Sequence, residues 1–107
     1  MSVEYLEVID IISIDLNGNA VLTISDELKW ENINEHLFIL QNKINAYLNA
    51  IESGTLYESY PNARDRQICI NLISKYEPND EAIEFLNKTK VILETVGYLF
   101  TFKVLNV

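Results

Sequence analysis

The residues best suited to chemistry in this 107-residue chain are its single histidine and its single cysteine, His36 and Cys69. A cysteine nucleophile needs a histidine beside it in space and a third group that orients the ring. The sequence places His36 on a predicted helix beside an apolar stripe, and Cys69 opposite the apolar face of a predicted strand. One histidine and one cysteine also cannot supply a four-ligand zinc site. We therefore predict no catalytic residue, no metal site and no cofactor.

Asp10 and Asp15 form the next candidate pair, because two neighbouring carboxylates can share acid–base chemistry or bind a metal ion. They stand five positions apart in a segment rich in β-branched residues, and a strand would project them from opposite faces. A solvated strand edge and turn is the alternative interpretation. A phosphate-binding glycine loop is excluded, because the three glycines of the sequence are isolated from one another.

Negative charge is concentrated in the first half of the chain. Residues 1–53 carry nine acids and two bases, a net charge of −7, whereas residues 54–107 carry seven acids and six bases, a net charge of −1. Four acids lie near the start of a predicted helix: Asp26, Glu27, Glu31 and Glu35. They either form a solvated face that complements the helix dipole or attract a basic protein partner. A pI near 4.5 argues against binding to nucleic acid.

Tyr57 and Tyr60 are candidate interface residues in a predicted loop over residues 55–65. Tyrosine offers rigid apolar area with a polar tip, which is typical of binding hot spots. The alternative is that both rings fold back over Phe38 and Ile39, which point away from the main apolar stripe of the preceding helix.

The strand and helix patterns predict a small mixed fold. Segments 6–16 and 20–25 are predicted to form a hairpin around Asn17-Gly18, which would pair Ile14 with Val21 and leave both faces substantially apolar. A helix is predicted from about residue 28 to 53, capped by Ser25-Asp26 and ended by Gly54. A strand over 67–75, a helix between residues 78 and 97, and a strand over 98–105 follow.

This order predicts one α+β domain over residues 1–107, a two-layer sandwich with ββαβαβ order, a mainly antiparallel four-stranded sheet and two helices. With one cysteine, no disulfide can form within the chain. The acidic N-terminus lacks the basic region of a signal peptide, and no apolar run reaches the roughly 20 residues needed to span a bilayer. These features predict a cytoplasmic protein that does not bind membranes.

Several strings of the sequence resemble a family of small bacterial proteins of about 100 residues, catalogued as a domain of unknown function. They are residues 8–15, 21–26, Trp30, 35–37, 41–48, 51–54 and 57–61. The resemblance implies no established activity, cofactor or catalytic residue, but small acidic proteins of this kind are often suspected of being immunity proteins for secreted toxins.

We therefore predict a non-enzymatic, acidic protein-binding domain, most concretely an immunity-type inhibitor of a basic toxin. The alternative is a homodimeric structural or regulatory subunit that associates through the hairpin or the centre of the long helix. An enzyme is the third hypothesis, and a deep pocket that contained His36 or Cys69 would favour it.

Overall fold

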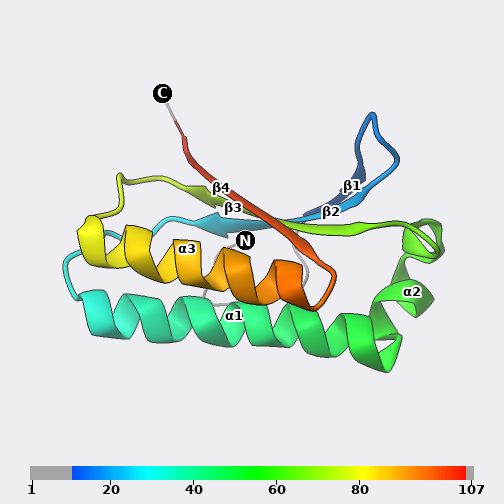
Figure 1. Cartoon of the computed structure of the whole chain (residues 1–107), viewed down its shortest axis with the longest axis horizontal. Coiled ribbons are helices and arrows are strands. Elements are labelled where there is room, and N and C mark those ends of the chain that lie inside the picture. Colours follow the sequence, from blue (N-terminus) through cyan, green and yellow to red (C-terminus); the bar gives the residue numbers. More distant parts are fainter. Residues whose placement is uncertain (1–10, 106–107) are drawn as a thin grey trace.

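The protein folds into two layers, a four-stranded sheet and a layer of helices that covers one of its faces (Figure 1). The computed structural model describes residues 11–105. The elements are β1 (Ile11–Ile14), β2 (Ala20–Asp26), α1 (Ile33–Ser53), α2 (Thr55–Ser59), the short 3-10 helix η1 (Pro61–Ala63), β3 (Ile68–Ser74), α3 (Asp80–Thr95) and β4 (Leu99–Val104). The predicted α+β class and the four strands are confirmed. The predicted order and the prediction of two helices were wrong, because α2 and η1 form between α1 and β3, where a loop was predicted over residues 55–65.

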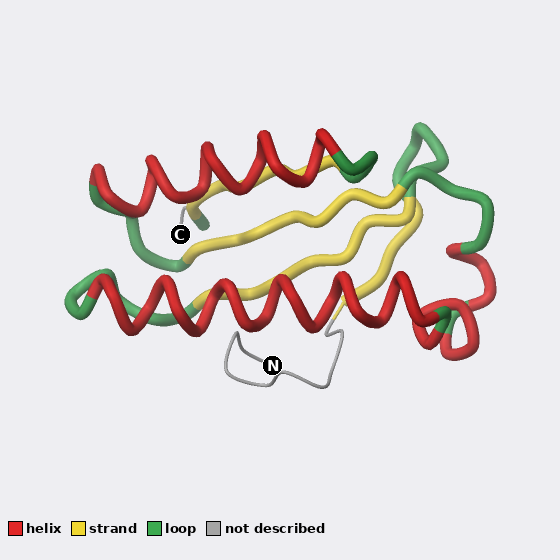
Figure 2. The backbone as a smooth tube through the Cα atoms, turned by 60° about the horizontal axis from the view of Figure 1, so that its bottom comes forward, coloured by secondary structure: helices red, strands yellow, loops and turns green. Residues whose placement is uncertain are grey.

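The sheet is mixed rather than mainly antiparallel, so that prediction was wrong. Its strands lie in the order β1-β2-β3-β4; β1 is antiparallel to β2, whereas β2, β3 and β4 are parallel. The physical reason is the long helix between successive strands, because a helical crossover returns the chain to the edge where the previous strand began. Both crossover helices, α1 and α3, run side by side over the same face of the sheet (Figure 2).

The hairpin turn is held by the side chain of Asp15. Its Oδ1 accepts hydrogen bonds from the backbone N–H groups of Asn17 and Asn19, each at 2.9 Å. The backbone N–H of Asp15 also donates to the carbonyl of Asn19 at 3.0 Å. The turn therefore spans residues 16–18 instead of the two predicted residues, which shifts the strand pairing by one position.

This shift turns one strand of the hairpin over relative to the other, because a change of one position moves side chains to the opposite face. Ile14 pairs with Ala20, and Ile12 pairs with Leu22. All four side chains lie on the helix-covered face, where they belong to the hydrophobic core or pack against it. The opposite face alternates polar Ser13 and Thr23 with Ile11 and Val21, so the prediction of two substantially apolar faces was wrong. The part of the first predicted strand before Ile11 lies outside the described residues.

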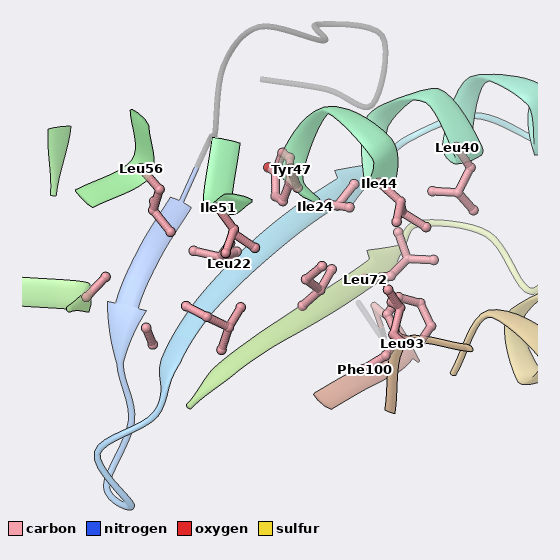
Figure 3. Close-up of a cluster of buried hydrophobic side chains, with 14 of the residues drawn as sticks. Leu22, Ile24, Leu40, Ile44, Tyr47, Ile51, Leu56, Leu72, Leu93 and Phe100 are labelled. Carbon is pink, nitrogen blue, oxygen red and sulfur yellow. The ribbon is translucent and has the colours of Figure 1, made fainter. Parts of the chain in front are cut away.

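The core lies between the sheet and the two long helices (Figure 3). Its strand residues occupy even-numbered positions, which share one face because side chains alternate along a strand. These residues are Ala20, Leu22, Ile24, Ile68, Ile70, Leu72 and Phe100. The helices contribute Leu40, Ile44, Tyr47, Ile51, Leu86 and Leu93. Burial of each large side chain stabilises the fold by about 1.5–3 kcal/mol.

Helix α1 begins at Ile33, five positions later than predicted. Its cap is Asn32, whose Oδ1 accepts a hydrogen bond from the backbone N–H of Glu35 at 3.3 Å. Glu35 Oε2 in turn accepts a hydrogen bond from Asn32 Nδ2 at 3.0 Å. The predicted cap at Asp26 was wrong, because Asp26 is the last residue of β2 and faces the helices. The predicted end at Gly54 is confirmed: its φ of 86° places it in the left-handed region.

Candidate functional site

The candidate site lies beyond the carboxyl ends of β2 and β3. Because these strands are parallel, the loops that leave them, residues 27–32 and 75–79, meet at the same edge of the sheet. The first turn of α1 starts at this edge too (Figure 1). In open α/β sheets ligands bind outside the carboxyl ends of the strands where successive crossovers go to opposite faces. Here α1 and α3 cover the same face (Figure 2), so the candidate site is defined by its residues.

A buried polar pair forms the floor of the site. Asp26 occupies an even-numbered position of β2, as Leu22 and Ile24 do, so its side chain is on the helix-covered face of the sheet. Its carboxylate points under the first turn of α1 and is 0% exposed. His36, which is 3% exposed, lies above it with Nε2 at 2.5 Å from Asp26 Oδ2. The second carboxylate oxygen accepts a hydrogen bond from the backbone N–H of Leu28 at 3.1 Å. The predicted exposed acid Asp26 is therefore an internal residue.

The indole of Trp30 covers the imidazole. The two rings are stacked with centroids 3.7 Å apart and an angle of 21° between their planes. Trp30 is itself fixed to the next loop, because its Nε1–H donates to the carbonyl of Tyr76 at 3.1 Å. Ser74 Oγ donates to the same carbonyl at 2.6 Å. These contacts tie the β2–α1 loop to the β3–α3 loop and hold the ring of His36 in one orientation.

Burial raises the pKa of Asp26 above its ordinary value of 3.8. The cause is the loss of hydration of the charged form, which disfavours ionisation. Three effects oppose it in part: the charge of His36, the hydrogen bond to His36 and the hydrogen bond from Leu28. In the tautomer of His36 that carries its proton on Nε2, this nitrogen donates to Asp26 Oδ2.

The second ring nitrogen of His36 is unsatisfied. Nδ1 is buried, and it has no hydrogen-bond partner among the described residues. A neutral imidazole that carries its proton on Nε2 presents a lone pair at Nδ1. In this tautomer the site contains a buried acceptor that has no donor among the described residues.

A pocket of about 530 Å³ lies over this pair. Three of the acids identified in the sequence, Glu27, Glu31 and Glu35, line it and are exposed to solvent. The other lining residues are Leu28, Lys29, Asn32, His36, Ile39 and Tyr76. The arrangement combines a carboxylate rim, partly apolar walls and a buried nitrogen acceptor. We refer to it below as the acidic pocket.

The two candidate tyrosines lie elsewhere, past the far end of α1 (Figure 1). Helix α1 has 21 residues and is therefore roughly 30 Å long. Tyr57 lies in α2 and Tyr60 follows it; both are half-buried and pack against the core. The Arg64 guanidinium carbon lies 5.4 Å from the centroid of the Tyr57 ring. The structure thus separates these tyrosines from the three glutamates, and Phe38 stays 63% exposed instead of being covered by them.

His36 and Cys69 do not meet. Cys69 lies in β3 at an odd position, so its thiol is on the face of the sheet that the helices do not cover, whereas His36 is on the helix side. Burial raises the pKa of Cys69 above 9.0, and the negative charge of Asp15 adds to that shift, against a hydrogen bond with Thr101. Asp15 itself is used in the hairpin turn, and Asp10 lies outside the described residues.

Sequence reasoning missed the Asp26–His36 pair, although a signal was present. Asp26 continues the even-numbered core positions of β2, and His36 continues the spacing of Leu40, Ile44 and Tyr47 on the buried face of α1. Both therefore had to point into the same interior. No sequence pattern indicated that Tyr76 lines the pocket. Its position there follows from the parallel pairing of β2 and β3, which brings the loops after both strands to the same edge of the sheet.

Two further findings concern residues 11–105. Within this range, no group of three or more His, Cys, Asp or Glu side chains is arranged to hold a metal ion. None of the helices in the described part of the chain is both long enough and apolar enough to cross a membrane.

Fold and site together define a small two-layer α+β domain with an acidic pocket at the carboxyl ends of its parallel strands. The chain belongs to the DUF6572 family, a family of unknown function, whose sequence profile matches residues 1–106. No curated protein and no solved structure matches the chain.

Proposed function

We propose that the protein is a non-enzymatic, acidic protein-binding domain that acts as an immunity-type inhibitor of a basic bacterial toxin. The observation that carries the proposal is the grouping of Glu27, Glu31 and Glu35 around one pocket. With Lys29 as the only basic side chain that lines it, the formal charge of the lining is 1 − 3 = −2 when His36 is neutral. Such a surface attracts a positively charged partner and raises its rate of association.

The charge distribution of the whole sequence supports the same proposal. The first half of the chain carries −7 of the total charge of −8, and the acidic pocket is built mainly from that half. A toxin that acts on nucleic acid needs a basic active site, and an acidic domain that covers this site would block it. In this scheme the glutamates steer the partner, and the half-buried walls of the pocket supply the desolvated contact.

A capture experiment from a lysate of the native host tests this proposal. The full chain serves as bait, with washes at low and at high salt, and a retained basic protein is then assayed for toxicity and for inhibition by the full chain. The test variant carries Glu27→Gln, Glu31→Gln and Glu35→Gln. The matched control carries Glu52→Gln, Glu58→Gln and Glu94→Gln, which change the net charge equally at exposed positions away from the pocket.

We expect the pocket variant to lose about tenfold in affinity for the basic partner, since three exposed ion pairs of about 0.5 kcal/mol each sum to that factor. The control should lose less, and high salt should reduce the difference between the two variants. Equal binding by the wild-type chain and both variants would contradict the proposal.

A homodimeric structural or regulatory subunit is the second candidate, and the outer surface of α3 favours it. Val91, Ile92 and Val96 are each more than 60% exposed, and Ile83 lies on the same helix at 38%. An exposed apolar group of this kind marks many protein–protein contacts. Light scattering distinguishes the candidates: a concentration-dependent dimer that Val91→Glu abolishes favours the subunit, and a monomer at high concentration counts against it.

A further inference from the structure

We infer that the acidic pocket binds the guanidinium group of an arginine side chain on the basic partner. This inference rests on the proposed function, because it names the part of the partner that enters the pocket. Two independent observations carry it: the three carboxylates at the rim, and the buried Nδ1 of His36, which has no hydrogen-bond partner among the described residues.

The unsatisfied nitrogen points to a ligand that donates a hydrogen bond. In the tautomer in which Nε2–H of His36 donates to Asp26, Nδ1 is left as an acceptor. A buried acceptor without a partner costs free energy, and a donor that enters the pocket removes this cost. Because Asp26 and the stacked Trp30 fix the ring, the acceptor is oriented before the ligand arrives.

The charge of the pocket points to a cation rather than an anion. The N-terminal end of a helix by itself attracts anions. Here Asn32 already satisfies the backbone N–H of Glu35, and the carbonyl of Asn32 accepts from the N–H of His36 at 3.0 Å. Glu31 and Glu35 add negative charge at the same place. An anionic ligand would be repelled by the three carboxylates of the pocket, whereas a cationic ligand would be stabilised by them.

The shape and lining favour arginine over lysine. A guanidinium presents five N–H donors in a planar fork, which suits several separate acceptors, whereas an ammonium is a compact point charge. Its plane also stacks on aromatic rings, and Tyr76 forms part of the wall. This ring already attracts two cations, because Lys29 Nζ lies 5.8 Å and Lys75 Nζ 5.7 Å from its centroid. Leu28 and Ile39 are half-buried and can contact the methylene groups of the arginine.

The only histidine of the sequence provides a direct probe. The full chain is labelled with ¹⁵N at its histidine ring, and long-range ¹H–¹⁵N correlation spectra are recorded during titration with N-acetyl-glycyl-arginyl-glycinamide. The corresponding lysine peptide and the neutral citrulline peptide are titrated in parallel. We expect a saturable change of the Nδ1 resonance with the arginine peptide, a smaller one with lysine and the smallest with citrulline.

Two matched variants locate the binding site. Glu35→Gln should weaken the arginine peptide about two- to fivefold, the value of one exposed ion pair. Glu58→Gln removes the same charge within α2, outside the pocket, and should leave the affinity nearly unchanged. Lys29→Gln removes the only competing cation of the pocket lining and should tighten binding by a similar two- to fivefold factor. Equal effects of Glu35→Gln and Glu58→Gln would overturn the inference, since they would indicate a diffuse attraction.

The same readout separates this inference from the proposed function. If the basic partner binds in a glutamate-dependent manner while both ring nitrogens of His36 keep their resonances, the proposed function stands and the arginine pocket is wrong. If the arginine peptide shifts Nδ1 but no basic partner depends on the glutamates, the pocket stands as a guanidinium site and the proposed inhibitor function fails. A protein that responds to neither the peptide nor the partner contradicts both.

Discussion

The two ends of α1 are stabilised by different physical means. At the N-terminal end, the chain buries a charged side chain, Asp26, and satisfies it with His36 and a backbone N–H. At the C-terminal end, the left-handed residue Gly54 turns the chain into α2, whose Leu56 is buried in the core. One end is organised by directional hydrogen bonds, and the other by a backbone conformation and apolar packing.

This difference indicates where function is to be expected. Apolar contacts are non-directional and stabilise the fold wherever enough area is buried. A buried carboxylate costs stability unless it is paired, and the pair here leaves one nitrogen of the imidazole unsatisfied beneath a pocket. The proposed function therefore belongs to the polar end, and the apolar end supports the fold.

The largest expected effect that tests this comparison comes from His36→Ala. The substitution leaves Asp26 buried with only the Leu28 N–H as a partner and removes a ring that Trp30 stacks against, so we expect a loss of about 3–5 kcal/mol in the free energy of unfolding. This loss is measured by urea denaturation monitored by circular dichroism. Trp30 fluorescence is unsuitable as a readout, because the substitution removes the ring that stacks on the indole.

Two control variants accompany this measurement. Asp26→Asn combined with His36→Ala removes the buried charge and should recover part of the loss. Tyr60→Phe at the apolar end removes only a hydroxyl from a half-buried ring and should change the stability by less than about 0.5 kcal/mol. A loss below about 1 kcal/mol for His36→Ala would mean that the polar end does not depend on the pair.

Much of the fold could be predicted from local patterns, and the errors have specific causes. The even-numbered strand positions, the stripe Leu40, Ile44, Tyr47 and Ile51, and the glycine at position 54 all indicate their elements directly. The hairpin register could not be read from Asn17-Gly18, because the Asp15 carboxylate stabilises a turn one residue longer. A long helix between two neighbouring strands of a sheet makes those strands parallel. This rule predicts parallel β2 and β3, but the strong hairpin pattern of the first two strands favoured an antiparallel sheet.

The candidate site was predicted only in part, for a similar reason. Glu27, Glu31 and Glu35 were recognised by their charge, which is visible in the sequence. Their common pocket was not, because it depends on Tyr76 and on the β3–α3 loop, whose position follows from parallel strands. Tyr57 and Tyr60 were grouped with the glutamates by residue type alone, although α1 keeps the two sets apart.

The next largest effect concerns the apolar end. Gly54 has a φ of 86°, and a Cβ placed there would meet no atom within 4 Å. The cost of Gly54→Ala is therefore conformational rather than steric, and we expect a loss of about 1–2 kcal/mol. Gly54→Asn should cost less, because asparagine tolerates the left-handed region. Urea denaturation compares the two variants; equal losses would indicate that the conformation at position 54 does not limit stability.

The smallest expected effect is a pH dependence confined to the polar end. Since burial raises the pKa of Asp26 above 3.8, the folded protein binds this proton more tightly than the unfolded chain. The stabilisation from this proton is fully present below pH 3.8 and is lost as the pH rises through the pKa of the folded state. Asp26→Asn should therefore gain stability relative to the wild-type chain over this interval, as measured by urea denaturation at a series of pH values.

Gly54→Asn at the apolar end is the control, and its stability should follow the wild-type curve in parallel. A parallel curve for Asp26→Asn as well would show that the carboxyl group at position 26 keeps an ordinary pKa. A difference for Asp26→Asn alone would place the proton-sensitive part of the fold beneath the acidic pocket, where a bound cation would favour the ionised carboxylate and shift the same curve toward lower pH.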